Sequence, residues 1–287
     1  MAQISFSIVV VCLNPGEKLL KTVQSVLNQK YGNYEIVVKD GGSTDGSLEQ
    51  LPADSRIRVY TRPDSGIYDA MNQAMSYVTG QFVQFLNCGD LLHDDMVLER
   101  LAAVMERKRS RGADGEGLGH KEKERIFYGN QYHEAWGSVI YSAPEVNDFT
   151  CYRNVPCHQV CFYDVRLFAE RGYDVKYRVR ADYEHFLYCI YDRKAEAVYV
   201  EMIVADYEGG GFSETRENRR ISEKEHAEIT KRYLGRDKAL RYKLLLTLAP
   251  LRTKLAEDEK YSEWYNGIKA KIYGRCGHKD EPGENRK

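Results

Sequence analysis

The sequence has no apolar run of the roughly 18 residues that a membrane-spanning helix needs. Its longest candidate is the short stretch from Leu244 to Leu251. The N-terminus also lacks the basic start, the long apolar middle and the small-residue cleavage site of a signal peptide, and it predicts a strand instead. We therefore expect a cytoplasmic protein that does not span a membrane.

Paired cysteine motifs are missing as well. The seven cysteines are odd in number and show no C-x-x-C framework, which argues against both a disulfide scaffold and a zinc site. Cys157 and Cys161 lie on either side of His158, but a soft metal site needs four ligands and this spacing does not supply them. Free thiols in a reducing cytoplasm fit the pattern best.

Neither sign of charge is in excess, because 42 lysines and arginines stand against 43 aspartates and glutamates. Bulk charge therefore indicates no particular partner, and no nucleic acid is expected. A length of 287 residues with 43% hydrophobic residues fits one large globular domain, with or without an appendage, better than two equal domains.

Strand and helix patterns alternate through the first hundred residues. The β-branched run from Ile4 to Leu13 predicts a buried parallel strand, and Leu20, Val23 and Leu27 follow it at helical spacing. Later segments continue the alternation: strands at Tyr34 to Lys39, Ile57 to Thr61 and Phe82 to Leu86, with a short helix after Asp45 and a helix from Ile67 to Val78. This order predicts an α/β fold with a doubly wound, mostly parallel sheet and helices on both faces.

Polar loops follow three of the predicted strands, at Leu13 to Glu17, Asp40 to Asp45 and Asn87 to Asp90. Ligands of doubly wound sheets bind at the carboxyl ends of the strands, so these loops are the candidate binding segments. Asp40 can accept hydrogen bonds from a base N–H or a ribose hydroxyl. The alternative is a tight turn with a helix cap, which explains the glycines and Ser43 but does not require Asp40.

Asp90 lies just past a buried strand and next to a glycine. A hard cation such as Mg²⁺ or Mn²⁺ is typically held by one or two carboxylates and completed by diphosphate oxygens and water, so Asp90 is a candidate ligand. The alternative is that Asp90 is an ordinary turn or cap residue.

Four segments in register resemble a known family: the three loops above and Arg62 to Asn72, which reads RPDSGIYDAMN. The chain resembles family 2 glycosyltransferases with the GT-A fold, and within them the bacterial polysaccharide-assembly branch, over roughly residues 4–215. The resemblance implies that Asp40 contacts uracil or ribose and that Asp90 is the metal-binding end of a DxD-like motif. It also implies that other side chains border the nucleotide and line the donor side: Asn14 and Glu17, and Asp64, Asp69 and Asn72.

The chain departs from the family pattern at three positions. Asn87 and Gly89 stand where many relatives have acidic residues, so Asp90 is the one certain carboxylate of the metal motif. Gly41 replaces the second aspartate of the usual double-Asp turn. Metal dependence is therefore expected to be weak, or the cation to be held mainly by the donor diphosphate.

In the second half, Val155 to Gln159 and Arg180 to Glu184 resemble the acceptor-side strand and the catalytic acidic motif of the same branch. The resemblance implies Asp182 as general base, with Glu184 as the alternative base, and His158 and Gln159 on the acceptor side. A position at a helix start would keep Asp182 ionised. The alternative is that Asp182 only caps its helix.

A glycine-rich segment that contains Gly210 resembles the family's flexible loop near the diphosphate, with a simple turn as the alternative. The expected organisation is one domain over residues 1–215, with a nucleotide-binding half at about 1–95 and an acceptor half at about 126–215. Between them, about 107–125, the charged and glycine-rich sequence predicts a mobile insertion. Residues 216–275 predict a helical extension and residues 276–287 a disordered tail.

The resemblance implies an inverting glycosyltransferase that moves a sugar from a nucleotide-sugar donor, a UDP-sugar being favoured, to a saccharide or a lipid-linked saccharide, with Mn²⁺ or Mg²⁺ as cofactor. Two alternatives remain open. One is a catalytically degenerate nucleotide-sugar binding protein. The other is a sugar-phosphate nucleotidylyltransferase, which would normally show a basic, glycine-rich loop after its first strand, unlike Leu13 to Lys18.

The tail carries a basic amphipathic pattern. Residues 236–254 contain six basic residues against the single acid Asp237, and Leu240, Leu244, Leu245 and Leu248 recur at helical spacing. Such a helix can lie on the anionic inner face of a membrane. The alternative is that its leucines pack on the catalytic domain or on a second subunit of a homodimer.

Overall fold

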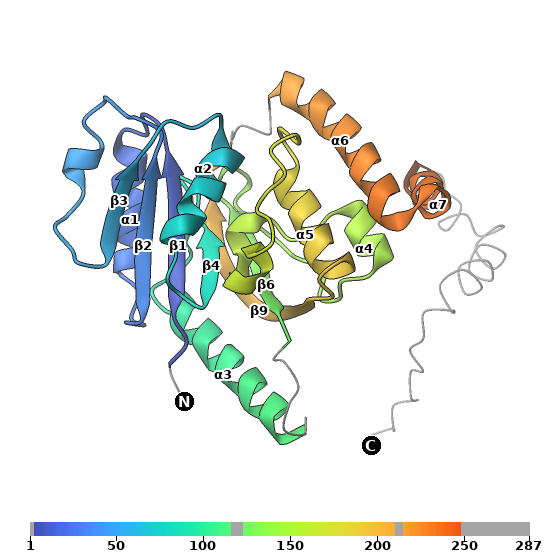
Figure 1. Cartoon of the computed structure of the whole chain (residues 1–287), viewed down its shortest axis with the longest axis horizontal. Coiled ribbons are helices and arrows are strands. Elements are labelled where there is room, and N and C mark those ends of the chain that lie inside the picture. Colours follow the sequence, from blue (N-terminus) through green and yellow to red (C-terminus); the bar gives the residue numbers. More distant parts are fainter. Residues whose placement is uncertain (1–2, 116–122, 210–214, 248–287) are drawn as a thin grey trace, which may run out of the picture. The chain divides into compact units, whose positions relative to one another are not determined.

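A central mixed sheet organises the first part of the chain in the structure, a computed structural model that describes residues 3–115, 123–209 and 215–247 (Figure 1). In space the strands run in the order β3 (Ile57–Thr61), β2 (Tyr34–Asp40), β1 (Phe6–Cys12), β4 (Phe82–Phe85), β8 (Cys161–Asp164), β6 (Arg125–His133), β9 (Glu196–Tyr207) and β5 (Leu91–Leu92). β7 (Ser138–Ile140) pairs with β6 outside this path.

The strands of the first half pair in parallel, as their sequences predict. β1 lies between β2 and β4, and β2 pairs with β3, all in parallel. β8 then joins β4 in antiparallel orientation, and β6 and β9 pair in parallel beyond it. This arrangement confirms the α/β class and the doubly wound layout, and it adds an antiparallel junction between the two halves of the sheet.

Helices cover both faces of the sheet, and β1 shows why. All of its residues are buried, and successive side chains point to opposite faces, so Ile8 and Val10 enter one core while Val9 and Val11 enter the other. The first core is closed by α1 (Glu17–Leu27) and α3 (Val97–Gly115), and the second by α2 (Ile67–Ala74) and α5 (Ala181–Tyr191).

Three local expectations need correction. The helix predicted after Asp45 is a single 3-10 turn at Leu48–Gln50, and α2 ends at Ala74 with a 3-10 turn at Met75–Tyr77 after it. The insertion predicted at 107–125 is helical as far as Gly115, because α3 continues, and β6 begins at Arg125. Strong helix formers continue the helix past Met105, and Lys108 Nζ is 3.0 Å from Glu196 Oε1 on β9. Residues 116–122 lie outside the described residues.

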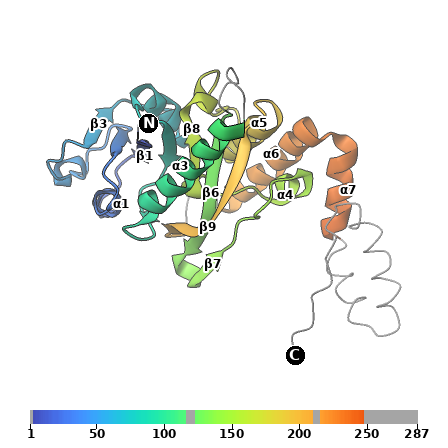
Figure 2. The same cartoon turned by 90° about the horizontal axis from the view of Figure 1, so that it is seen from below.

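The second half adds α4 (Asp148–Arg153) and α6 (Arg216–Leu234), and Figure 2 shows α6 beside α4 and α5. Residues up to Leu234 form one compact unit, and a second unit begins at Gly235. Of that unit the structure describes α7 (Arg236–Thr247); the rest of the predicted extension and the tail at 276–287 lie outside the described residues. Among the described helices, none is long and apolar enough to cross a membrane.

Candidate active site

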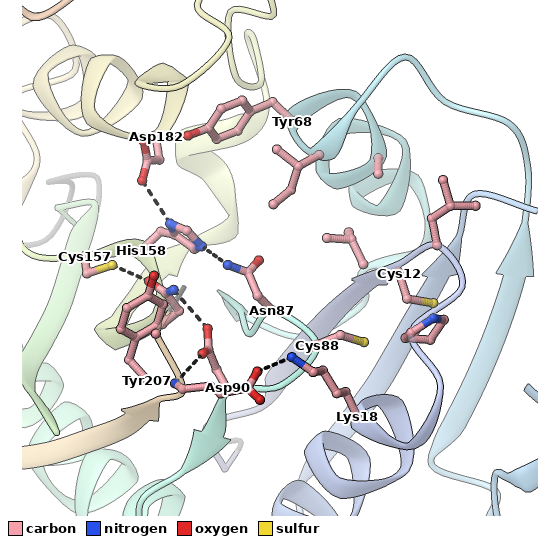
Figure 3. Close-up of a pocket in the computed structure, with 18 of the residues that line it drawn as sticks. Cys12, Lys18, Tyr68, Asn87, Cys88, Asp90, Cys157, His158, Asp182 and Tyr207 are labelled. Carbon is pink, nitrogen blue, oxygen red and sulfur yellow. Dashed lines mark hydrogen bonds and ion pairs between the residues drawn. The ribbon is translucent and has the colours of Figure 1, made fainter. Parts of the chain in front are cut away.

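A cavity of about 920 Å³ opens at the carboxyl ends of β1 and β4 (Figure 3). The first half of the chain lines it with Asn14, Lys18, Asp64, Tyr68, Asn87 and Asp90, among others. The second half supplies Gln131, His133, Trp136, His158, Gln159, Asp182 and Tyr207. Figure 3 shows Cys12 and Lys18 on one side of the cavity and Asp182, Cys157 and Tyr207 on the other.

Asp182 and His158 form the central polar contact of this cavity. His158 Nδ1 lies 2.9 Å from Asp182 Oδ2, and His158 Nε2 lies 3.1 Å from Asn87 Nδ2. Because the Asn87 amide donates to Nε2, the imidazole proton of a neutral His158 belongs on Nδ1, where it is donated to Asp182. The site thus joins His158 just before β8, Asp182 at the start of α5 and Asn87 in the loop after β4.

The Asp182 carboxylate is held in its ionised form. Burial by itself raises the pKa of this carboxyl, but hydrogen bonds from His158, from the hydroxyl of Tyr68 and from the N–H of Tyr183 outweigh that effect and lower the pKa below its ordinary value. Tyr68 Oη is 2.9 Å from Asp182 Oδ1, and the N–H of Tyr183 donates to the same oxygen at 2.8 Å. Of the contacts made by His158, Tyr68 and Tyr183, only the one from the Tyr183 N–H is of the kind that a helix cap makes, so Asp182 does more than cap α5.

Asp90 is the second carboxylate of the cavity, and its environment is different. It is 3% exposed, and burial raises its pKa to about 6. Its Oδ2 accepts a hydrogen bond from Gln159 Nε2 at 3.0 Å and its Oδ1 from the N–H of Glu208 at 3.2 Å. Thr22 on α1 fixes the loop, because its hydroxyl donates to the Asp90 carbonyl and accepts from the N–H of Gly89.

The loop that carries Asp90 also offers a second hard oxygen. Asn87 Oδ1 is buried and has no hydrogen-bond partner in the described part of the chain, although Asn87 Nδ2 is engaged with His158. No cluster of three or more His, Cys, Asp or Glu side chains that could hold a metal ion occurs within the described ranges. Asp90 and Asn87 therefore fit a hard cation only as a partial ligand set, which phosphate oxygens of a bound donor would complete.

Of the residues predicted to contact the nucleotide or line the donor side, Asn14 and Asp64 line the cavity. Asn14 adopts a left-handed backbone with φ 48° and its Oδ1 accepts the N–H of Thr44, so it ties the first loop to the second. Asp64 pairs with Lys39 at 2.8 Å, and the Lys39 side chain is 1% exposed. This buried ion pair holds the loop after β3 against β2.

Other predicted donor-side residues have structural contacts instead and do not line the cavity. The Asp40 carboxylate is buried in its turn, where it accepts the N–H groups of Gly42 and Ser43, and its direct contact with a nucleotide stays a prediction. Asp69 accepts the N–H of Ser65 at the start of α2. Asn72 exchanges two hydrogen bonds with the backbone of Tyr173, and Glu17 is exposed and 3.8 Å from Lys21.

Glu184 does not reach the acceptor side of the cavity, which corrects the expectation for this residue. It is fully buried and its carboxylate pairs with Arg171 at 2.9 Å and accepts from the hydroxyl of Tyr233 on α6. Two residues along a helix rotate a side chain by about 200°, so Asp182 and Glu184 face different neighbours. Gly210 lies outside the described residues.

Several lining residues escaped the sequence analysis. Lys18 forms an ion pair with Glu208, at 2.5 Å, across the mouth of the cavity. Tyr68 lies inside the Arg62 to Asn72 segment that carries the family resemblance. The sequence could therefore have indicated its hydroxyl as a polar group of the site on α2. His133 and Trp136 had no such signal, because only the pairing of β6 with β9 brings them to the cavity.

Comparisons with known proteins agree with this architecture. Residues 7–170 match the family described as Glycosyl transferase family 2. The PGL/p-HBAD biosynthesis glycosyltransferase of Mycobacterium tuberculosis is 31% identical over 226 residues, covering 75% of this chain and 81% of that protein.

Two solved structures share the fold. Residues 1–349 of S. aureus TarS in complex with UDP-GlcNAc align with a TM-score of 0.60 at 16% identity, over 80% of this chain and 72% of that one. The mannosyltransferase PcManGT from Pyrobaculum calidifontis, in complex with GDP-Man and Mn²⁺, aligns with a TM-score of 0.52 at 12% identity, over 96% and 88% of the two chains.

The fold and the cavity at its strand ends define a nucleotide-sugar-dependent glycosyltransferase of the GT-A type. By its match over more than half of its length, the chain belongs to glycosyl transferase family 2.

Proposed function

We propose that this protein is an inverting glycosyltransferase that uses Asp182 as its general base. An acceptor hydroxyl gives its proton to the Asp182 carboxylate and attacks the anomeric carbon of the donor, and the nucleoside diphosphate leaves from the opposite face. A nucleotide-sugar donor already carries a good leaving group, so a single carboxylate base is sufficient. The observation that carries the proposal is the carboxylate of Asp182, which is ionised and faces the cavity.

His158 and Tyr68 act as positioning residues for this base. Each holds one oxygen of Asp182, which fixes the carboxylate plane and leaves further lone pairs of both oxygens for an acceptor hydroxyl. Their donated hydrogen bonds keep Asp182 charged at neutral pH, at the cost of some basicity.

Asp90, with the oxygen of Asn87, would hold Mn²⁺ or Mg²⁺ together with the donor diphosphate. Such a cation supplies Lewis-acid neutralisation of the charge that develops on the leaving diphosphate. Burial raises the pKa of Asp90 to about 6, so the carboxyl is available as an anionic ligand above that pH.

The donor is proposed to be a UDP-sugar and the acceptor a saccharide or lipid-linked saccharide. A structural neighbour is described with UDP-GlcNAc and another with GDP-Man, and one relative is named for PGL/p-HBAD biosynthesis. These similarities support a nucleotide-sugar donor and leave the identity of its nucleobase to be tested. We place the protein in the cytoplasm, in contact with the inner face of the membrane where a lipid-linked acceptor would lie.

A two-part experiment tests the proposal. UDP-, GDP- and dTDP-sugars with Mn²⁺ are screened by the rise in melting temperature that native-state binding produces, and the best donor is then used to measure nucleotide release with acceptor glycosides. Asp182→Asn should lower turnover by a factor on the order of 10² or more, because the base is lost, while the donor still raises the melting temperature.

Asp192→Asn is the matched control, because Asp192 is an exposed carboxylate at the opposite end of the same helix. It should leave turnover unchanged. Wild-type turnover in Asp182→Asn would exclude Asp182 as the base. Donor binding without any turnover in the wild type would instead favour the degenerate binding protein. Family membership gives no support to the nucleotidylyltransferase alternative.

A further inference from the structure

The cavity extends past the catalytic carboxylate onto the connection between β6 and β7. His133 ends β6, and Trp136 follows in a 3-10 turn at Glu134–Trp136. Their rings are stacked, with centroids 3.9 Å apart and planes within 7° of parallel. His133 is 4% exposed whereas Trp136 is 69% exposed, and both line the cavity. The stack therefore presents a broad aromatic surface that is supported from beneath by a buried ring.

The position of this stack is fixed by the sheet. His133 pairs with Tyr207 in the β6–β9 register, and the Tyr207 ring meets the His133 ring edge-on at 5.1 Å. The next residue, Glu208, donates its N–H to Asp90. A Cβ at Gly209 would lie 3.1 Å from His133 Cε1, so a glycine here lets the backbone pass close to the ring. The aromatic surface is thus tied to the acidic loop of the site.

His133 also carries an unused polar atom. Its Nδ1 is buried and has no hydrogen-bond partner within the described residues. Buried polar atoms are nearly always paired, so an unpaired ring nitrogen at this depth calls for a buried water rather than a ligand in the cavity. His133 covers one face of Trp136, and the other face of this exposed ring matches the face of C–H groups that a pyranose ring presents.

We propose that Trp136, supported by the buried ring of His133, forms an acceptor subsite that binds a hexopyranose ring, with the sugar's C–H face on the outer face of Trp136. This inference rests on the proposed function, because it names the class of acceptor for the same site. A nucleobase also stacks on aromatic rings, but the predicted nucleotide contacts belong to the first half of the chain, and Cys12 and Lys18 of that half lie across the cavity from Tyr207 (Figure 3).

Nucleotide release from the best donor, measured against methyl glycosides of common hexoses, tests the subsite. In the wild type at least one glycoside should stimulate release. Trp136→Ala should raise the KM for that glycoside about tenfold, the loss expected for one aromatic contact, with a smaller change in kcat. Trp136→Phe should keep most of the affinity. His133→Ala removes the ring beneath Trp136 and should raise the KM for that glycoside, whereas His133→Phe keeps a ring there and should raise it less.

Tyr141→Ala is the matched control, because Tyr141 is an aromatic side chain, 76% exposed, that follows β7 and does not line the cavity. It should leave the KM unchanged. An unchanged KM in Trp136→Ala would overturn the subsite, and so would wild-type donor hydrolysis that no glycoside stimulates. Failure of the proposed function looks different, since the wild type would then neither hydrolyse nor bind a nucleotide-sugar.

Discussion

Asp182 and Asp90 are carboxylates of one cavity whose surroundings shift their pKa values in opposite directions. Hydrogen-bond donors surround Asp182 and lower its pKa, whereas burial dominates at Asp90 and raises its pKa to about 6. The two residues therefore suit different tasks. In the proposed reaction, Asp182 stays charged and accepts a proton from a neutral hydroxyl, and Asp90 is a costly buried anion until a cation shares its charge.

Asp90→Asn should make the protein without donor more stable at pH 8 by up to about 3 kcal/mol. The folded protein keeps the Asp90 proton at pH values where the unfolded chain has lost it. The contribution of this group to the free energy of unfolding is therefore present at low pH and is lost as the pH rises through about 6. The advantage of the variant should therefore shrink below pH 6 and vanish near pH 4. Denaturant unfolding at a series of pH values measures it.

Asp69→Asn is a control for which the stability difference between variant and wild type should have the opposite sign. The N–H of Ser65 lowers the pKa of the Asp69 carboxyl, so this group's contribution is present at neutral pH and is lost as the pH falls through the lowered pKa. The variant should be less stable than the wild type at pH 8, and the difference should diminish in acid. A stability difference for Asp90→Asn that does not change with pH would contradict the raised pKa of Asp90 in the folded protein.

At the scale of elements, α6 holds the loop that leads to Asp182, the proposed base. Glu225 on α6 accepts hydrogen bonds from the backbone N–H groups of Arg178, Val179 and Arg180, at 2.7, 3.0 and 2.9 Å. Asp182 follows two residues later. Because α5 has no side-chain cap of its own at Arg180, the carboxylate of another helix takes over that task.

Glu225→Ala should cost about 3 kcal/mol of unfolding free energy, because buried N–H groups lose a charged acceptor. Turnover should also fall, since the loop before Asp182 loosens, while the donor still raises the melting temperature. Glu225→Gln keeps one acceptor oxygen and should show an intermediate loss. Glu223→Ala, an exposed position on the same helix, serves as control and should change neither quantity. Equal effects at the two positions would contradict this role of Glu225.

At the scale of the whole molecule, the basic tail bears on where the enzyme works. α7 carries Arg236, Lys238, Arg241 and Lys243, and three of its four leucines are exposed, with Leu240 at 59% and Leu244 at 53%. Exposed leucines among basic residues are what adsorption to an anionic membrane requires, and this adsorption stays a prediction. Packing on the catalytic domain or on a second copy of the chain remains the competing interpretation.

The full chain should co-sediment with phosphatidylserine-containing vesicles at low salt and be released as ionic strength rises, because each nearby basic residue contributes about 1 kcal/mol that salt screens. A chain that ends at Gly235 should stay in the supernatant. Neutral vesicles provide the control. Binding that salt does not weaken, or equal binding by the shortened chain, would exclude the tail as the anchor.

Local sequence determined most of the elements around the site. The buried run of β1, the helix at Ala181–Tyr191 and the polar loops after β1, β2 and β4 all follow from hydrophobic period and turn residues within a short window. The family resemblance then implied that Asp182 and Asp90 are the carboxylates of the site; the structure brings both to one cavity, and their roles stay predictions. Periodicity and turn chemistry are local properties, which is why no tertiary information was needed.

Tertiary structure alone decided which polar side chains face the cavity. Asp69 and Asn72 lie in a recognised segment, yet their partners are Ser65 and the backbone of Tyr173. Glu184 stands two residues from Asp182 and is buried against Arg171 instead. The stack of His133 and Trp136 reaches the site only because β6 pairs with β9, some seventy residues later in the sequence. Such contacts depend on long-range strand pairing and helix rotation, and no local pattern encodes them.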